Sequence, residues 1–168
     1  MNTPTPLIPL LPLVIEIFWG TLGLILILVF HGSAINHVIM RFERLSKKNL
    51  AAKKYNWVFS HFYTAFIFIA LIHIAEIAIW AVFILRMHLM EDGVAALLFS
   101  GSCYTTVGFI QDILPVGWKS LAFFISFSGL FSFAWTTSVM IVMTTSYKDA
   151  WNLKYVPHQH RPENSPRN

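Results

Sequence analysis

Long apolar runs dominate the pattern of hydrophobic and polar positions along the chain. Three of them exceed the roughly 20 residues that a helix needs to cross a hydrocarbon core of about 30 Å. They cover approximately residues 7–30, 57–85 and 118–143. Few charged residues interrupt them, namely Glu16, Glu76 and Lys119. The pattern therefore predicts three transmembrane helices.

A fourth apolar segment, residues 93–104, lies between the second and third runs. It is too short to cross a membrane and too apolar for an exposed loop, and Asp92 is predicted to cap its start. The residues that follow it are Thr105, Thr106, Val107, Gly108 and Phe109. Non-helical backbone at membrane depth occurs only where it is buried in protein or lines a wet cavity. A half-helix and a short extended strand that returns to the side of entry meet this condition, whereas the alternative is an interfacial hairpin.

Such a half-helix would favour a cation at its inner end. Its C-terminus, the negative end of the helix dipole, would point toward the middle of the membrane. The carbonyl groups of the strand can replace the hydration shell of an ion. Gly108 reaches backbone angles that are closed to other residues and lets carbonyls on either side of it point the same way. One strand cannot surround an ion, so several subunits would have to meet at an axis.

Composition and charge agree with a membrane protein. Hydrophobic residues make up 56% of the chain and charged residues only 12%, against roughly 25% in soluble domains. Short cytoplasmic loops collect Lys and Arg. We therefore predict an external N-terminus and a cytoplasmic C-terminus, and we interpret the net charge of +4 as a topology signal, not as a nucleic-acid site. Ten of the twelve basic residues lie in two places: Arg41, Arg44, Lys47, Lys48, Lys53 and Lys54 in the first link, and Lys148, Lys154, Arg161 and Arg167 in the tail.

Motifs for catalysis are lacking. The sequence has no nucleophile motif, no metal-ligand spacing and no phosphate-binding glycine loop in a suitable context. Its single cysteine, Cys103, cannot form an intrachain disulfide. We expect no enzyme activity, no cofactor and no metal beyond permeating cations.

Several motifs resemble potassium-channel pore domains. The residues from Thr105 to Phe109 are similar to the TTVGY part of the selectivity signature, with Phe109 in the tyrosine place. Gly129 falls where many such channels carry a hinge glycine. Over residues 57–145 the chain is similar to small bacterial members of the two-transmembrane-helix, pore-loop ion-channel family. Three more motifs carry this resemblance: H-x-x-E-I-A-x-W-A at 73–81, Leu-Pro-x-x-Trp at 114–118 and Trp-Thr-Thr at 135–137.

The resemblance implies an all-α membrane protein that forms a homotetramer in the bacterial inner membrane. Each subunit would have an N-terminal transmembrane helix (1–40), a basic cytoplasmic loop (41–56), a pore domain (57–146) and a flexible cytoplasmic tail (147–168). The pore domain would comprise an outer helix, a re-entrant pore helix, a selectivity filter formed by Thr105, Thr106, Val107, Gly108 and Phe109, and an inner helix. Potassium, with sodium as a second candidate, would pass through it without a cofactor.

The chain departs from the family signature after Gly108. The signature continues Gly-Tyr-Gly-Asp, but residues 108–112 here are Gly-Phe-Ile-Gln-Asp. The β-branched Ile110 is a poor substitute where a positive φ is needed. We expect a rearranged outermost carbonyl ring and assign no strict potassium selectivity. Two alternatives stay open: a non-conducting pore-like subunit, and a haem- or quinone-binding redox protein that would use His31, His37, His61 or His73.

Polar residues inside the apolar runs mark further candidate sites. Glu76 lies near the centre of the second run, and His73 lies on the same helical face. We expect this pair to be buried and hydrogen-bonded without a switching role; the alternative is a pair that braces the pore helix or changes its coupling to the pore with pH. Glu16 is expected to be solvated or paired with a neighbour. Four hydroxyl residues of the third run are candidates for lining a cavity below the filter: Ser128, Ser132, Thr136 and Thr137.

Overall fold

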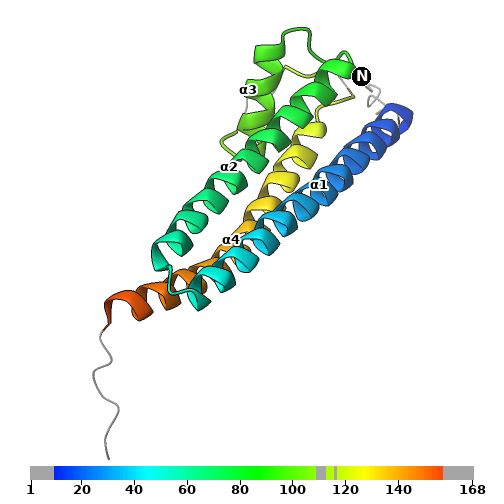
Figure 1. Cartoon of the computed structure of the whole chain (residues 1–168). Coiled ribbons are helices and arrows are strands. Elements are labelled where there is room, and N and C mark those ends of the chain that lie inside the picture. Colours follow the sequence, from blue (N-terminus) through cyan, green and yellow to red (C-terminus); the bar gives the residue numbers. More distant parts are fainter. Residues whose placement is uncertain (1–9, 109–112, 116, 157–168) are drawn as a thin grey trace, which may run out of the picture.

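The computed structural model describes residues 10–108, 113–115 and 117–156. These residues form four α-helices and their connections: α1 (Leu10–Ala51), α2 (Tyr55–Arg86), α3 (Gly93–Tyr104) and α4 (Leu121–Tyr155) (Figure 1). Helices α1, α2 and α4 are long and apolar enough to cross a membrane, so the three long apolar helices predicted from the sequence are confirmed. The start of the first apolar run, the predicted filter residue Phe109 and the tail beyond Val156 lie outside the described residues.

The long helices extend further than the apolar runs. Residues 41–51 and 147–155 are helical, where a basic loop and a flexible tail were expected from the sequence. The link between α1 and α2 is therefore only residues 52–54, with Lys53 at a positive φ of 56°. Leu, Arg, Lys and Glu are good helix formers, so the helix continues where the apolar run stops. Phe42 on this extension joins a buried apolar cluster between α1, α2 and α4, whose other members are Ile35, Ala65, Ile69, Val139 and Met143.

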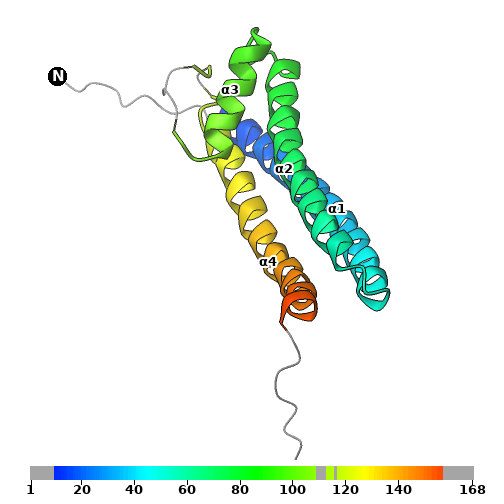
Figure 2. The same cartoon turned by 60° about the vertical axis from the view of Figure 1, so that its left-hand side comes forward.

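Helices α2 and α4 form the middle of the bundle. Both pack against α1 and both pack against α3, whereas α1 and α3 have no contact with each other within the described chain (Figures 1 and 2). Helix α1 approaches its neighbours closely at Gly23 and Gly32, where the rings of Trp80 and Trp135 occupy the space a side chain would need. This close packing of glycine against an aromatic ring is typical of membrane helices, whose interfaces favour small residues.

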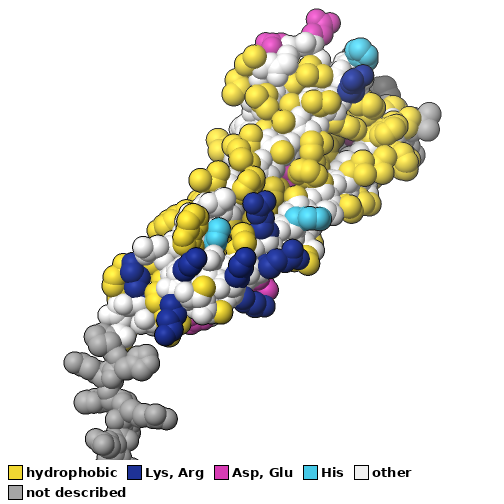
Figure 3. Space-filling view, in the orientation of Figure 1, with side chains coloured by type: hydrophobic (Ala, Val, Ile, Leu, Met, Phe, Trp, Pro, Cys, Tyr) yellow, Lys and Arg dark blue, Asp and Glu magenta, His cyan; other side chains and the backbone are white. Residues whose placement is uncertain are grey.

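Apolar side chains cover most of the surface. Figure 3 shows them along the middle and the upper half of the bundle, whereas Lys and Arg gather at the end where α1 meets α2. Phe18, Ile67, Phe123 and Ile141 are each at least 60% exposed. A water-soluble protein rarely exposes apolar surface on this scale. The distribution is consistent with a multi-pass membrane protein.

Glu16 of α1 caps the start of α4. Its Oε1 atom accepts hydrogen bonds from the backbone N–H groups of Ser120, at 2.5 Å, and Leu121, at 3.1 Å. The first N–H groups of a helix have no partner within it, and a negative charge there also interacts favourably with the positive end of the helix dipole. Of the two states expected for this residue, the solvated one is therefore wrong: the side chain of Glu16 is buried and paired.

Replacing Glu16 with leucine should loosen the first turn of α4. The change leaves the part-buried N–H of Ser120 without this acceptor and the N–H of Leu121 with only the Trp118 carbonyl at 3.3 Å, at a cost of about 1–2 kcal/mol. We expect faster hydrogen exchange of the Ser120 and Leu121 amides, measured by mass spectrometry on the purified protein. The matched variant Glu16→Gln keeps a carbonyl acceptor and should retain most of the protection. Equal exchange in the leucine variant and the parent would contradict the cap.

Candidate functional site

Helix α3 lies where the sequence predicts the pore helix. The Asp92 carboxylate accepts a hydrogen bond from the backbone N–H of Val94 at 2.8 Å, so the predicted N-cap is confirmed. Ala96, Phe99 and Cys103 are buried against α2 and α4. The helix begins at the end of the bundle where α2 ends and α4 begins, and its C-terminus reaches the level of Glu76 in α2 (Figure 1).

Gly129 of α4 accommodates the C-terminus of α3. A Cβ atom at this position would lie 2.0 Å from the Tyr104 carbonyl oxygen and 2.9 Å from its carbonyl carbon. Both are backbone atoms, which cannot move aside as the end of a flexible side chain can. The structure thus provides a packing reason for this glycine, in addition to the hinge role that the family resemblance suggests.

The residues after α3 form a turn. Val107 N–H donates to the Ser102 carbonyl at 3.1 Å and Thr106 N–H to the Cys103 carbonyl at 3.0 Å, with Thr106 at φ 57°. This is a Schellman arrangement, which satisfies the last carbonyl groups of a helix. The extended strand expected from Thr105 onward is therefore wrong for Thr105 and Thr106. A strand needs a partner for its backbone groups, and in the single chain these groups bond to the helix end instead.

The filter candidates lie on the surface of the subunit. Thr105, Thr106, Val107 and Gly108 are all exposed, and the apolar side chain of Val107 is 81% exposed. Gly108 has a φ of +98°, an angle that favours glycine, and no atom lies within 4 Å of the place a Cβ would take. Its carbonyl accepts a hydrogen bond from the Ser102 hydroxyl at 2.6 Å.

A closed ring of hydrogen bonds joins all four helices beside the C-terminus of α3. Glu76 of α2 lies at its centre: His31 Nδ1 of α1 is 2.6 Å from one carboxylate oxygen, and the Tyr104 hydroxyl of α3 donates to the other. Tyr104 also contacts His73 Nδ1 at 2.8 Å, and His73 Nε2 lies 3.1 Å from the Thr136 hydroxyl of α4. Thr136 closes the ring with the longest contact, 3.4 Å to His31 Nε2. We call these five residues the polar ring.

The polar ring corrects the expected His73–Glu76 pair. His73 Nδ1 is 4.0 Å from the nearer carboxylate oxygen, and Tyr104 connects the two residues. The direct partner of Glu76 is His31, which the sequence offered only as a haem ligand. A buried carboxylate in a membrane span needs polar partners, and His31 is a histidine at the end of an apolar run. The sequence thus indicated that Glu76 needs a polar partner, but it did not identify His31 as that partner.

Counting protons shows that the polar ring is uncharged as a whole. Each of its five hydrogen bonds needs one proton, and Tyr104 and Thr136 supply one each. His31, His73 and Glu76 must supply the other three. Two of these three protons are the single N–H protons of neutral imidazoles. The third proton lies either on the Glu76 carboxyl group, which is then neutral, or on a histidine, which is then positive beside a negative Glu76. In either case the charges cancel, as burial in an apolar environment requires.

Among the described residues, the polar ring contains the one group of three His, Cys, Asp or Glu side chains that lie close enough together to hold a metal ion. His31, His73 and Glu76 each offer a ligand atom, and these atoms lie within 4.8 Å of one another. They are also satisfied by hydrogen bonds to each other and to Tyr104 and Thr136. The imidazole rings of His31 and His73 are 5.4 Å apart between centroids and share Thr136 as a neighbour. This packing leaves no space for a porphyrin between them.

The hydroxyl residues of α4 point mostly into the subunit. Ser128 is buried and accepts a hydrogen bond from Trp80 Nε1 at 2.9 Å, and Ser132 is also buried. Thr136 belongs to the polar ring. Thr137 is exposed and donates to the Phe133 carbonyl of its own helix at 2.8 Å. Of the four candidates for a cavity lining, only Thr137 is therefore placed on the outside of the subunit.

No protein-family model, curated protein or solved structure matches the chain. Its function is inferred from three features of its own: the short apolar helix α3 among three long ones, the exposed segment that follows α3, and the polar ring at the helix end.

Proposed function

We propose that the chain is one subunit of a homotetrameric cation channel of the two-transmembrane-helix, pore-loop type, located in the plasma membrane with its basic end in the cytoplasm. The observation that carries the proposal is the course of α3. This apolar helix of 12 residues starts beside the C-terminus of α2 and ends beside the polar ring, and α4 then starts again at the end of the bundle from which α3 began (Figure 2).

The length of α3 supports a re-entrant position. Twelve residues of helix span about 18 Å, roughly half of a bilayer with its headgroups. Its C-terminal, negative end would then lie near the middle of the membrane and attract a cation. The carbonyl groups of Thr105, Thr106, Val107 and Gly108 follow directly and would replace water around the ion. Phe109, the fifth filter candidate, lies outside the described residues.

Exposed apolar side chains near this segment support assembly with further copies. Three apolar side chains are each more than 60% exposed: Leu98 of α3, Val107 in the segment after α3, and Phe123 of α4. One segment cannot surround an ion, so copies must meet around an axis, and fourfold symmetry is the arrangement that the family resemblance implies. In such a tetramer these side chains would lie at subunit contacts or against lipid.

Conduction requires a rearrangement of the segment after α3. The Ser102 hydroxyl must release the Gly108 carbonyl, and Thr106, a β-branched residue in the left-handed region, must return to an ordinary backbone conformation. Contacts between subunits would compensate for the hydrogen bonds lost at the helix end. The permeating ions are potassium, with sodium as the second candidate.

Ion flux into liposomes tests the proposal. We expect potassium flux through the reconstituted protein, and its abolition by Gly108→Pro, because proline fixes φ near −65° where the glycine has +98°. Gly93→Pro is the matched control: Gly93 is the first residue of α3, a position that favours proline, and it should leave the flux unchanged. A Gly108→Pro variant that conducts like the parent would contradict the pore. Sodium gradients measured in parallel give the selectivity.

A non-conducting pore-like subunit is the second candidate. The hydrogen bond from Ser102 to the Gly108 carbonyl favours it, as does Ile110 in place of the second signature glycine. A well-formed tetramer without flux of either ion would support this function. The redox alternative has no structural observation in its favour, and an absorbance scan without a Soret band would remove its haem form.

A further inference from the structure

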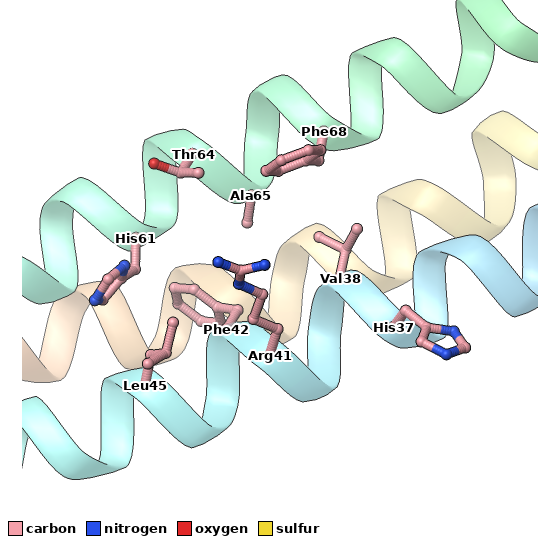
Figure 4. Close-up of a pocket in the computed structure, with 9 residues that line it drawn as sticks. All are labelled: His37, Val38, Arg41, Phe42, Leu45, His61, Thr64, Ala65 and Phe68. Carbon is pink, nitrogen blue, oxygen red and sulfur yellow. The ribbon is translucent and has the colours of Figure 1, made fainter.

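A cavity between α1 and α2 lies at the basic end of the bundle (Figure 4). Its volume is about 220 Å³. Apolar side chains, among them Val38, Phe42 and Phe68, form much of its wall. Its polar residues include Arg41 and His61, and Figure 4 shows the Arg41 side chain extending from α1 toward α2. The cavity thus combines an apolar wall with a cation.

Aromatic side chains place this cavity at the level of a membrane interface. The Trp57 ring lies 6.0 Å from that of His61, one turn away on α2. Tyr147 packs against Phe62 at 5.0 Å and stacks on Trp151 at 6.4 Å, joining α2 to α4 at the same end of the bundle. Trp and Tyr gather where lipid headgroups meet acyl chains. A ligand in the cavity would therefore meet both parts of a lipid.

The charge around the cavity is positive. Arg41 is exposed and has no ion pair within the described part of the chain, so its guanidinium is available to a ligand. Arg44 and Lys48 follow on α1, while Glu43 is already paired with Lys47 at 3.4 Å. Figure 3 shows the resulting cluster of Lys and Arg over this end of the bundle. The guanidinium fork matches the geometry of phosphate oxygens.

We propose that this cavity binds an anionic phospholipid from the leaflet at the basic end of the bundle. Arg41 holds the phosphate, and the His61 imidazole lies near enough to α1 to contribute an N–H donor. One acyl chain follows Val38, Ala65 and Phe68 toward the membrane interior. Basic pockets between transmembrane helices on the cytoplasmic side are suited to such headgroups. This site is separate from α3 and the segment after it, so lipid binding does not depend on whether the protein conducts.

Native mass spectrometry of the full-length protein tests the site. The protein is released from nanodiscs that contain equal amounts of phosphatidylglycerol and phosphatidylcholine, and the lipids retained per subunit are counted. We expect phosphatidylglycerol to be retained preferentially and Arg41→Gln to reduce its retention about tenfold, the effect of losing a charge-assisted hydrogen bond. Arg44→Gln, which removes the same charge outside the cavity wall, should retain it as the parent does.

Three outcomes would overturn the proposal. The first is equal retention of the two lipids, and the second is equal loss in the Arg41 and Arg44 variants, which would indicate a diffuse charge effect. The third is displacement of the lipid by millimolar glycerol phosphate, which would show that the headgroup alone binds and that the apolar wall is unused. The same spectra report the oligomeric state of each variant, so a folding defect is recognised directly.

Discussion

Replacing Glu76 with leucine is expected to lower the stability of the protein by about 2–6 kcal/mol, because two buried polar groups lose a hydrogen-bond partner at about 1–3 kcal/mol each. In an environment without water, the Tyr104 hydroxyl loses its acceptor and His31 Nδ1 loses its hydrogen-bond partner. Each of these groups then incurs its full desolvation penalty. We expect the apparent melting temperature of the purified protein to fall by about 10 °C.

The variant Glu76→Gln is the matched control, because proton counting predicts a different outcome for it. Its amide group can donate to His31 Nδ1 while its carbonyl accepts from Tyr104, so all five hydrogen bonds of the polar ring persist with both histidines neutral. We expect its melting temperature to stay within a few degrees of the parent. Equal, large losses in both variants would show that the polar ring depends on an ionised carboxylate, and a stable leucine variant would show that it contributes little.

The polar ring connects stability to the proposed pore. Tyr104 is both a member of the ring and the last residue of α3, directly before the filter candidates. His31 brings α1, which would be an additional helix in the proposed two-helix pore, into the same network. A function for α1 follows from this: it fixes the depth and orientation of the α3 C-terminus through the Glu76 carboxylate.

Gly129→Ala is the second substitution with a large expected effect. The added methyl group would lie 2.0 Å from the Tyr104 carbonyl oxygen, so α3 and α4 must separate by about 1 Å or more. This shift strains the hydrogen bonds of Tyr104 within the polar ring. We expect a melting temperature several degrees lower and a loss of potassium flux, each measured on the same purified preparation.

The control for this variant is Gly101→Ala on α3. A Cβ at Gly101 meets the Ile77 side chain at 3.6 Å, an ordinary contact, and alanine favours the helix. This variant should be as stable as the parent. A Gly129→Ala protein that melts like the parent but shows altered flux would favour the hinge role instead of the packing role.

The sequence predicted the helices where local signals were strong. Asp92 and the apolar residues after it identified α3 with its bounds, because an N-cap and an apolar run mark a helix directly. The C-terminal ends of α1 and α4 were not predicted, because an apolar run indicates which residues can lie in the membrane and does not indicate where the helix ends. Residues 41–51 are rich in polar helix formers and continue the helix beyond the apolar run.

The site was predictable only in part. Glu76 and His73 stood out as polar residues in an apolar run, but their partners His31, Tyr104 and Thr136 come from three other helices. Only tertiary packing brings these positions together, and spacing along one helix suggested the nearer His73 as the direct partner. The turn at Thr106 was likewise hidden, because a β-branched residue is expected to be extended and the hydrogen bonds to the end of α3 overrode that preference.

Single-channel recording tests directly whether the protein forms a cation-conducting pore. The purified protein is inserted into a planar bilayer of phosphatidylglycerol and phosphatidylcholine, first with a concentration gradient of potassium chloride and then with potassium chloride on one side and sodium chloride on the other. We expect discrete current steps that Gly108→Pro abolishes and Gly93→Pro retains, with reversal potentials that identify cations as the carriers and measure the preference for potassium over sodium. An electrically silent bilayer that contains confirmed tetramers, or steps carried by chloride, would contradict it.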